Sequence, residues 1–443
     1  MAIVTLLVVT VVFLFAQHNE SLPAGSQYDI ISKVNFGSYR DASSSKPQVA
    51  TSAFPSSPVT THVPALVASP IASQDENPTP ESSVLDPHNV QSFPSPSAPD
   101  DSTAPSQVPD PLMTLQDKEP PPTFEAEYQF QQDLDLDLPI EKLQSLSTHN
   151  PHNYNPTSPQ TYAYATFMAT RNPSLKDPYF LAIHSLIYRV LWSQRTRTTS
   201  YPFIVFVADF VTPAQRTLLS GAGAIVRELA PLDWEPNIPG VQKRWKDLFA
   251  KLNMWNETDF SRILFLDADA FPLENIDAMF DVAPVRSCDA AKLTLDDLLP
   301  DETPVCEDYI FAGVPQDPLA PEGEINVGSM VFTPSARMHA RLLQNYVKTE
   351  RYDCLMAEQA FLGWQFSHEG PFPASALGRE WGGFFPQEDE EGKLKVVHEK
   401  IWVAGEGWMR REWEGTWVEM LGFYESAEFE VSRQLDGLGL SLR

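Results

Sequence analysis

The stretch RILFLDADAF, residues 262–271, places four apolar residues directly before two aspartates. A continuous apolar run of this kind is typical of a buried strand in a parallel sheet. Side chains two residues apart on an extended segment point to the same side, so Asp267 and Asp269 converge where the strand leaves the sheet. Paired carboxylates are hard oxygen ligands suited to magnesium or manganese. The stretch predicts a cation site, and an Asp-rich loop that caps the next helix is the alternative.

Strand and helix patterns alternate along the chain before this stretch. Strands are predicted at 161–170, 203–209 and 224–229, and helices at 178–194, 213–220 and 244–257. This order indicates right-handed crossovers and an α/β fold with a mostly parallel central sheet flanked by helices. Such sheets bind ligands at the carboxyl ends of their strands. The two aspartates are expected at that edge.

The chain is strongly acidic, with a formal net charge of -28. This excludes binding of nucleic acid or of an anionic membrane face through a broad basic surface. An anionic ligand would therefore need local cations or a metal ion.

The N-terminal third is predicted to lie outside the folded domain. Residues 2–16 are apolar and uncharged, which suits a cleaved signal peptide or a tilted signal anchor. Many of the 40 prolines follow together with Ser and Thr, and that composition cannot bury enough apolar area to offset chain entropy. We divide the chain into a signal segment (1–20), a disordered stem (21–150) and one folded domain (151–443). The expected location is the secretory pathway, either as a type II membrane protein of the Golgi lumen or as a secreted protein.

The cysteines and one glycosylation sequon are also relevant to the expected location in the secretory pathway. Three cysteines are too few for a disulfide framework and fit no zinc motif. Cys288 and Cys306 could form a bridge in an oxidising lumen or remain buried thiols, and the sequence leaves both alternatives open. Asn256 lies in an Asn-Glu-Thr sequon that a luminal enzyme could glycosylate.

Phosphatases of the haloacid dehalogenase type use the same Asp-x-Asp pattern after an apolar strand. Their first Asp is a nucleophile and their second a general acid. That motif normally ends the first strand of its domain and is followed by Thr or Val two places on. Here it ends the fourth predicted strand, and Phe271 occupies that place. The phosphatase hypothesis is therefore a minor alternative.

The surrounding residues resemble the core of glycosyltransferase family 8, the glycogenin-like group. The matching stretch is FAKLNMWNETDFSRILFLDADAFPLENIDAMF, residues 249–280. In that family a helical Lys, here Lys251, precedes an aromatic, here Trp255, and an apolar strand that ends in Asp-x-Asp. The likeness implies a nucleotide-binding α/β fold of the GT-A type, a UDP-sugar donor, manganese or magnesium, and sugar transfer with retention of anomeric configuration.

Two further segments resemble the donor site of the family. AYATFMAT with a downstream tyrosine is similar to the strand and loop that hold uridine, which implies roles for Ala169, Thr170 and Tyr179. INVGSMVFTPS resembles the Asn-x-Gly strand of the family. It places Asn326 and Gly328 against the donor sugar.

The metal site implied by the resemblance combines the aspartates with a distant histidine. KVVHEKIW is similar to the family's terminal strand, whose histidine is here His398. The implied ligands are Asp267, Asp269 and His398. Ala268, between the aspartates, is assigned to donor binding.

The residues expected to act on the phosphates and the sugar depart from the family in two places. The Lys-Pro-Trp whose lysine grips the diphosphate is absent, and Lys400 is the expected substitute beside Lys251. AEQAFLGWQF places Gln359 near the anomeric carbon, with Glu358 where the family usually has Asp. Glu358 is the one nucleophile candidate for a covalent intermediate, and same-face attack guided by the leaving phosphate is easier to support.

The resemblance implies transfer of a hexose or an N-acetylhexosamine onto a glycan or glycoprotein acceptor. Neither the sugar nor the acceptor follows from the sequence. A catalytically silent module of the same fold that binds a UDP-sugar or a glycan is the alternative hypothesis.

Overall fold

The computed structural model of the protein describes residues 124–155, 162–236, 238–317 and 324–439. All of these residues belong to one compact unit. The predicted signal segment, and the predicted stem as far as residue 123, lie outside the described residues. None of the helices in the described ranges combines the length and the apolar character needed to cross a bilayer.

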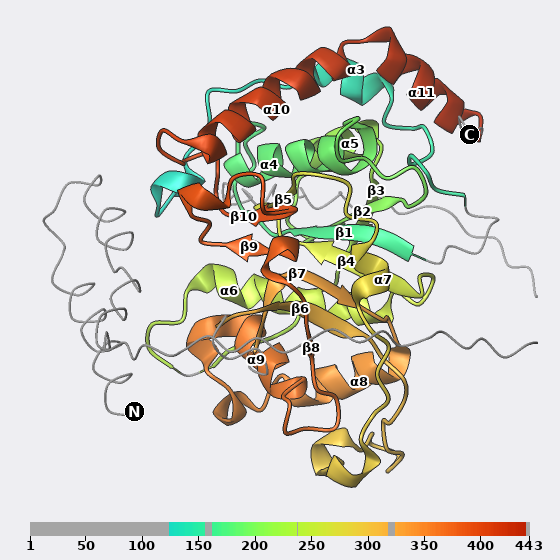
Figure 1. Ribbon diagram of the computed structural model, residues 1–443, viewed down its shortest axis with the longest axis vertical. Helices are drawn as coiled ribbons and strands as arrows, with labels where there is room; N and C mark the ends of the chain where they lie inside the picture. Colours follow the sequence, from blue (N-terminus) through green and yellow to red (C-terminus); the bar gives the residue numbers. More distant parts are fainter. Residues whose placement is uncertain (1–123, 156–161, 237, 318–323, 440–443) are drawn as a thin grey trace, which may run out of the picture. The chain divides into compact units, whose positions relative to one another are not determined.

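A seven-stranded sheet with the order β3-β2-β1-β4-β7-β6-β8 forms the centre of the unit (Figure 1). Its strands are β1 (Tyr162–Met168), β2 (Phe203–Val207), β3 (Ile225–Glu228), β4 (Arg262–Leu266), β6 (Phe311–Pro315), β7 (Ile325–Phe332) and β8 (Ser375–Ala376). Strands β3, β2, β1 and β4 are parallel, β7 runs antiparallel between β4 and β6, and β8 is parallel to β6. The prediction of a mostly parallel sheet with helices around it is confirmed.

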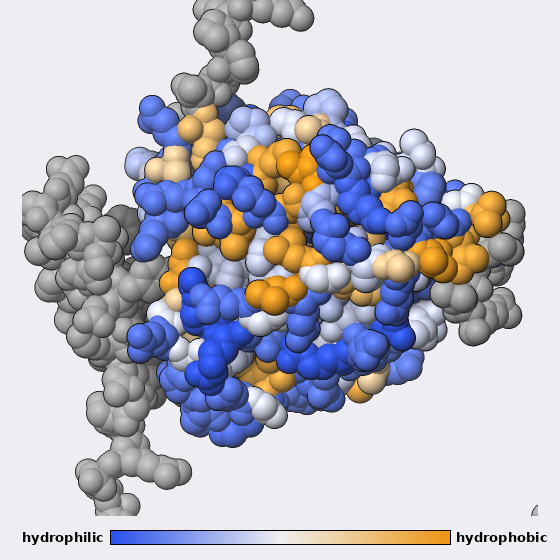
Figure 2. Space-filling model, turned by 90° about the horizontal axis from the view of Figure 1, so that it is seen from above, coloured by the Kyte–Doolittle hydropathy of each residue, from blue (hydrophilic) through white to orange (hydrophobic). Residues whose placement is uncertain are grey.

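Helices cover both faces of this sheet (Figure 1). On one side lie α3 (Ile140–Ser145), α4 (Pro178–Ile187), α5 (Pro213–Gly221), α10 (Trp408–Tyr424) and α11 (Ala427–Gly437), and on the other α6 (Lys243–Leu248), α8 (Ala336–Asn345) and α9 (Ala357–Gln365). Both α4 and α5 begin with proline after a capping residue, Asp177 and Thr212 respectively. On the side of α10 and α11, hydrophilic residues surround separate apolar patches (Figure 2).

The helix predicted at 244–257 is two segments. It begins as α6 and continues as a 3-10 helix, η3 (Phe249–Asn256). Residues spaced three apart lie on one side of a 3-10 helix, and Phe249, Leu252 and Trp255 are all buried. This spacing of apolar residues favours the tighter winding, which also buries the side chain of Lys251. The predicted helix at 178–194 likewise ends in a π-helical turn, Tyr188–Trp192.

A second sheet of three short strands lies beside the end of β4. It has the order β5-β10-β9, formed by β5 (Ala270–Pro272), β10 (Val396–His398) and β9 (Gly383–Phe384). Strand β10 pairs antiparallel with β5 so that His398 lies opposite Ala270. Because β5 follows Asp269 directly, this pairing carries the histidine to the aspartates.

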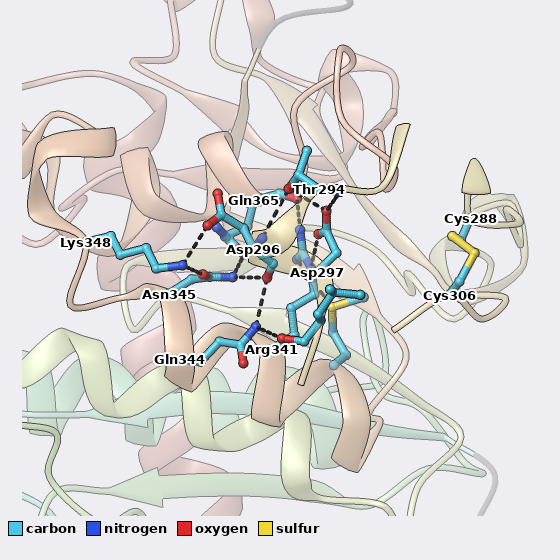
Figure 3. A network of polar contacts seen from close by, with 12 residues as sticks. Cys288, Thr294, Asp296, Asp297, Cys306, Arg341, Gln344, Asn345, Lys348 and Gln365 are labelled. Atoms are coloured by element: carbon cyan, nitrogen blue, oxygen red, sulfur yellow. Dashed lines mark hydrogen bonds and ion pairs between the residues drawn. A yellow bond between two sulfur atoms is a disulfide. The ribbon is translucent and has the colours of Figure 1, made fainter. Parts of the chain in front are cut away.

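The segment between α7 (Met279–Val282) and β6 is closed by a disulfide between Cys288 and Cys306. The sequence left open whether these cysteines form a bridge or remain buried thiols, and the structure shows the bridge. Within the segment, Thr294 and Asp297 form a capping box. Asp297 also accepts from Arg341 of α8, with 2.8 Å between Oδ1 and Nε (Figure 3). The disulfide closes the segment on itself, and the buried ion pair attaches it to α8.

The packed region begins before residue 151, where the sequence analysis placed its boundary. Residues 133–138 read DLDLDL. The last leucine of this stretch, Leu138, is buried, as are Leu143 and Leu146. Helix α3 packs so closely on α5 that a Cβ at Gly221 would lie 2.0 Å from the carbonyl oxygen of Leu143. Residues 124–150 are therefore part of the folded unit, because their leucines fill its core.

We expect a chain that begins at Ser147 to be less stable than one that begins at Phe124. Burial of a leucine stabilises by about 1.5–3 kcal/mol, so loss of Leu138, Leu143 and Leu146 should lower the melting temperature by roughly 10 °C or more. Thermal denaturation of the two purified chains measures the difference. Equal melting temperatures would show that residues 124–146 do not contribute to the core.

Candidate functional site

Two aspartates and one histidine meet at the carboxyl end of β4. Asp267, Asp269 and His398 each offer one ligand atom, and these atoms all lie within 4.8 Å of one another. His398 Nε2 is 3.8 Å from Asp267 Oδ2 and 3.4 Å from Asp269 Oδ1. The structure thus brings together the three residues that the resemblance assigned to a metal, although His398 comes from a separate strand.

Each aspartate divides its two oxygen atoms between the histidine and a lysine. Asp267 Oδ1 accepts a hydrogen bond from Lys251 Nζ at 2.8 Å, while Oδ2 faces His398. Asp269 Oδ2 accepts from Lys400 Nζ at 2.8 Å, while Oδ1 faces the histidine. One oxygen of each carboxylate therefore remains directed at a common point, and the lysines fix that orientation.

Opposite charges control ionisation in this partly buried site. Burial alone would lower the pKa of Lys251, but the neighbouring carboxylates outweigh it and raise the pKa. The same balance, with Asp269 as the main partner, raises the pKa of Lys400. Burial would raise the pKa of Asp269, whereas Lys400 and His398 hold it well below its usual range. The lysines are thus cations and Asp269 a carboxylate at neutral pH.

The site depends on the missing side chain of Gly328 in β7. A Cβ there would lie 2.1 Å from His398 Cε1 and 2.7 Å from Asp267 Oδ2. The Gly328 carbonyl accepts from the backbone N–H of Asp267 at 2.8 Å, and its own N–H donates to Asn326 Oδ1 at 3.0 Å. Close approach of β7 to the aspartates is therefore possible only with glycine at this position. The resemblance placed Asn326 and Gly328 against the donor sugar, and they lie at this same edge.

The catalytic candidates lie at the beginning of α9. Glu358 is buried, and its Oε1 accepts from Lys251 Nζ at 3.0 Å. Gln359 follows it and is half-buried. Ala357, the first residue of the helix, has φ of 49°, a region that costs energy for a residue with a Cβ. Lys251 thereby links Glu358 to the aspartate cluster.

The uridine candidates lie at the end of β1 and the beginning of α4. Ala169 and Thr170 follow β1 directly, and the Thr170 hydroxyl donates to Asp177 Oδ2 at 3.0 Å. Burial raises the pKa of the Tyr179 hydroxyl, and Lys400 is near enough to oppose that effect. The edge of the Tyr179 ring meets Trp402, with 5.4 Å between ring centroids. These residues therefore occupy the same end of the sheet as the aspartates.

Sequence reasoning missed an aromatic group on the N-terminal side of the domain. Lys400 Nζ lies 5.3 Å from the ring centroid of Phe130, and Arg244 Cζ lies 5.6 Å from the same ring. The signal that could have located this segment was the alternation of Asp and Leu at 133–138, which is typical of an extended segment with one buried face.

Comparison with known proteins places the chain among sugar transferases. No protein-family model matches it. Galactinol synthase 4 of Arabidopsis thaliana is 29% identical over 254 residues, with 54% of this chain and 72% of that protein covered. Galactinol synthases are family 8 proteins, and the aspartate cluster carries the pattern of that family. The chain resembles the glycosyltransferases of family 8. An uncharacterized protein of Schizosaccharomyces pombe is 25% identical to the transferase over 305 residues, with 60% and 81% of the two chains covered.

A solved structure of another glycosyltransferase is a more distant neighbour. GlyE of Streptococcus pneumoniae TIGR4 aligns at 13% identity with a TM-score of 0.35, over 59% of this chain and 63% of that chain. This chain therefore covers less than two thirds of GlyE. The family-8 resemblance is confirmed by these relatives, and the predicted α/β fold is confirmed by the central sheet and its flanking helices.

We expect Gly328→Ala to abolish assembly of the cluster without unfolding the domain. The new methyl group would overlap His398 and Asp267, so manganese affinity should fall at least about tenfold. Titration of manganese by calorimetry measures this. Gly415→Ala is the matched control, because a Cβ at that position meets nothing within 4 Å. Equal manganese affinity of Gly328→Ala and the parent would contradict the role given to this glycine.

Proposed function

We propose that the transferase moves a hexose or an N-acetylhexosamine from a UDP-sugar to a glycan or glycoprotein acceptor, with retention of configuration and with manganese or magnesium. The observation that carries the proposal is the convergence of Asp267, Asp269 and His398 at one point, with a lysine on the far oxygen of each aspartate. The relatives support sugar transfer in general. Donor, metal and acceptor are inferred from the site.

The residues present fit a divalent cation. Two carboxylate oxygens and an imidazole nitrogen are ligands that manganese and magnesium sites use. His398 Nδ1 is buried and has no hydrogen-bond partner among the described residues, whereas Nε2 faces the carboxylates. Lys251 and Lys400 orient the two carboxylates as outer partners of metal ligands do. A bound cation would stabilise the negative charge that develops as UDP leaves.

The charges of the site favour a diphosphate only when a cation is also bound. The carboxylates of Asp267, Asp269 and Glu358 outnumber the two ammonium groups of Lys251 and Lys400 by one. A diphosphate would be repelled by this excess. With a divalent cation the excess becomes positive, and the lysines can turn one hydrogen bond each to phosphate oxygens.

Same-face attack is the route that the contacts favour. Glu358 Oε1 is held by Lys251 at 3.0 Å and the side chain is buried, so this carboxylate is poorly placed to reach a sugar carbon. Gln359, half-buried beside it, can orient the sugar by hydrogen bonds. The leaving phosphate would then accept the proton of the attacking acceptor hydroxyl, with Lys251 stabilising the phosphate.

A catalytically silent module that binds a UDP-sugar or a glycan is the second candidate. It would use the same aspartates and lysines but show no turnover. A phosphatase acting through Asp267 would instead release inorganic phosphate from phosphate esters without UDP. Both alternatives are separated from the transferase by the products formed.

We expect release of UDP from one of the donors UDP-glucose, UDP-galactose or UDP-N-acetylglucosamine when manganese and an acceptor are present. Asp269→Asn should reduce the rate by at least about 100-fold, because it removes a charged ligand. Chelation of the metal should have the same effect. Asp389→Asn is the matched control, since that side chain is 80% exposed. UDP binding without any turnover would favour the silent module.

We also propose that the domain lies in the lumen of the secretory pathway, in the Golgi or after secretion. The Cys288–Cys306 disulfide supports this, because such bonds persist in oxidising compartments. The Asn256 sequon ends η3 and is exposed, close to the beginning of β4. That position is at the opposite end of the strand from the aspartates, so a glycan there would leave the site open.

We expect the protein made in a eukaryotic secretory host to carry a glycan on Asn256. Treatment with an N-glycosidase should increase its mobility, and Asn256→Gln should migrate like the treated parent. Thr258→Ser preserves the sequon and should keep the glycan. If the parent protein shows no change after the enzyme, exposure of this domain to the lumen is not supported.

A further inference from the structure

An extended segment of the chain lies across the nucleotide end of the domain. This segment, residues 128–138, is called the strap here. It precedes α3 and includes a short 3-10 helix, η1 (Gln129–Gln131). Its position before residue 151 predicted that it belongs to the stem, and sugar transfer at the aspartate cluster does not itself require it.

Hydrogen bonds to the loop after β1 and to Trp402 fix the strap in place. Its Phe130 carbonyl accepts from Trp402 Nε1 at 3.2 Å. The backbone N–H of Leu134 donates to the carbonyl of Lys176 at 3.0 Å. Asp133 Oδ1 accepts from Asn172 Nδ2 at 2.8 Å. Two of these bonds reach the loop that follows Thr170, which is the loop that the resemblance gives to uridine.

The strap brings two aromatic rings to two cations of the site. The rings of Tyr128 and Phe130 are stacked, with 5.2 Å between centroids and 4° between planes. Arg244 Cζ lies 5.7 Å from the first ring and 5.6 Å from the second. Lys400 Nζ, which bonds Asp269, lies 5.3 Å from Phe130. One lysine side chain therefore separates the strap from the aspartate cluster.

Arg244 carries a charge with no acidic partner in the described structure. Its Nε donates to Gln242 Oε1 at 2.7 Å, and the ion pairs among the described residues do not include it. An arginine whose charge is left without a carboxylate, next to aromatic faces in a strongly acidic protein, suits an anionic ligand with a flat ring. A nucleoside diphosphate has both features.

We propose that the strap is the outer wall of the nucleotide site, with Phe130 packing against the bound nucleotide and Arg244 contacting its phosphates or ribose. This inference rests on the proposed function, because it assumes that UDP occupies the site beside Tyr179 and Lys400. A removable plug would need few attachments, whereas the strap is fixed at Phe130, Asp133 and Leu134. Tyr128 is 41% exposed, so the stacked pair keeps a free surface toward solvent.

The test is calorimetric titration of UDP, with manganese present, into the parent chain and four variants. Phe130→Ala and Arg244→Gln should each weaken UDP binding about tenfold, in keeping with loss of a cation–π and stacking contact. Phe130→Tyr should restore affinity. Arg351→Gln is the matched control, because Arg351 Cζ also lies over an aromatic ring, 4.9 Å from the ring centroid of Trp364 on α9. Manganese affinity without UDP should be unchanged in all variants.

The UDP affinities distinguish a strap that forms the wall of the nucleotide site from one with another role. They also test the strap separately from the proposed function. Unchanged UDP affinity in Arg244→Gln and Phe130→Ala, even with a lowered melting temperature, would show that the strap only packs and would overturn the inference. Tighter UDP binding would show a plug and would also overturn it. If Phe130→Ala does not fold, Arg244→Gln decides. If the parent chain does not bind UDP at all, the proposed function is overturned. If the parent binds UDP and the variants bind it equally well, only the inference about the strap is overturned.

Discussion

The site depends on the hydrogen-bonded ion pair that each of its two aspartates forms with a lysine. Two carboxylates held close together in a partly buried place repel each other and lose hydration, and either effect alone would drive one of them to take up a proton. Lys251 and Lys400 remove that cost by bonding the far oxygen of Asp267 and Asp269. The fold meets this requirement from two directions, since one lysine comes from η3 and the other from the end of β10. The local architecture around β4 supplies both cations.

Much of this arrangement could be predicted from the sequence because its strands are short, apolar and fully buried. β2 appears in the sequence as an unbroken apolar run, and β1 and β4 are apolar except for Thr166 and Arg262. The carboxyl ends of these strands must share one edge of a parallel sheet. The position of His398 at that edge could be predicted only from the family resemblance. Nothing in the three residues of β10 indicates which strand they pair with, because register in so short a strand is fixed by tertiary packing.

The parts that the sequence did not predict share a physical reason. The break between α6 and η3 depends on where Phe249, Leu252 and Trp255 find space in the core, which a helical pattern alone does not reveal. The strap was assigned to the stem because composition averages over its proline-rich neighbours, although its leucines alternate with aspartates. The Cys288–Cys306 bridge depends on a three-dimensional approach that two cysteines in a sequence do not encode. In each case the local conformational preference of the residues was too weak to determine the structure. Contacts with residues distant in the sequence determined it.

The order of synthesis gives the site a further property. Lys400 and Asp269 are 131 residues apart in the chain, and Lys251 and Glu358 are 107 apart. As the chain emerges from the ribosome, both aspartates appear long before the histidine and the second lysine. A chain that ends before β10 therefore holds both aspartates and Lys251 but lacks His398 and Lys400. The full set of candidate ligands and orienting lysines exists only when nearly the whole domain has been made.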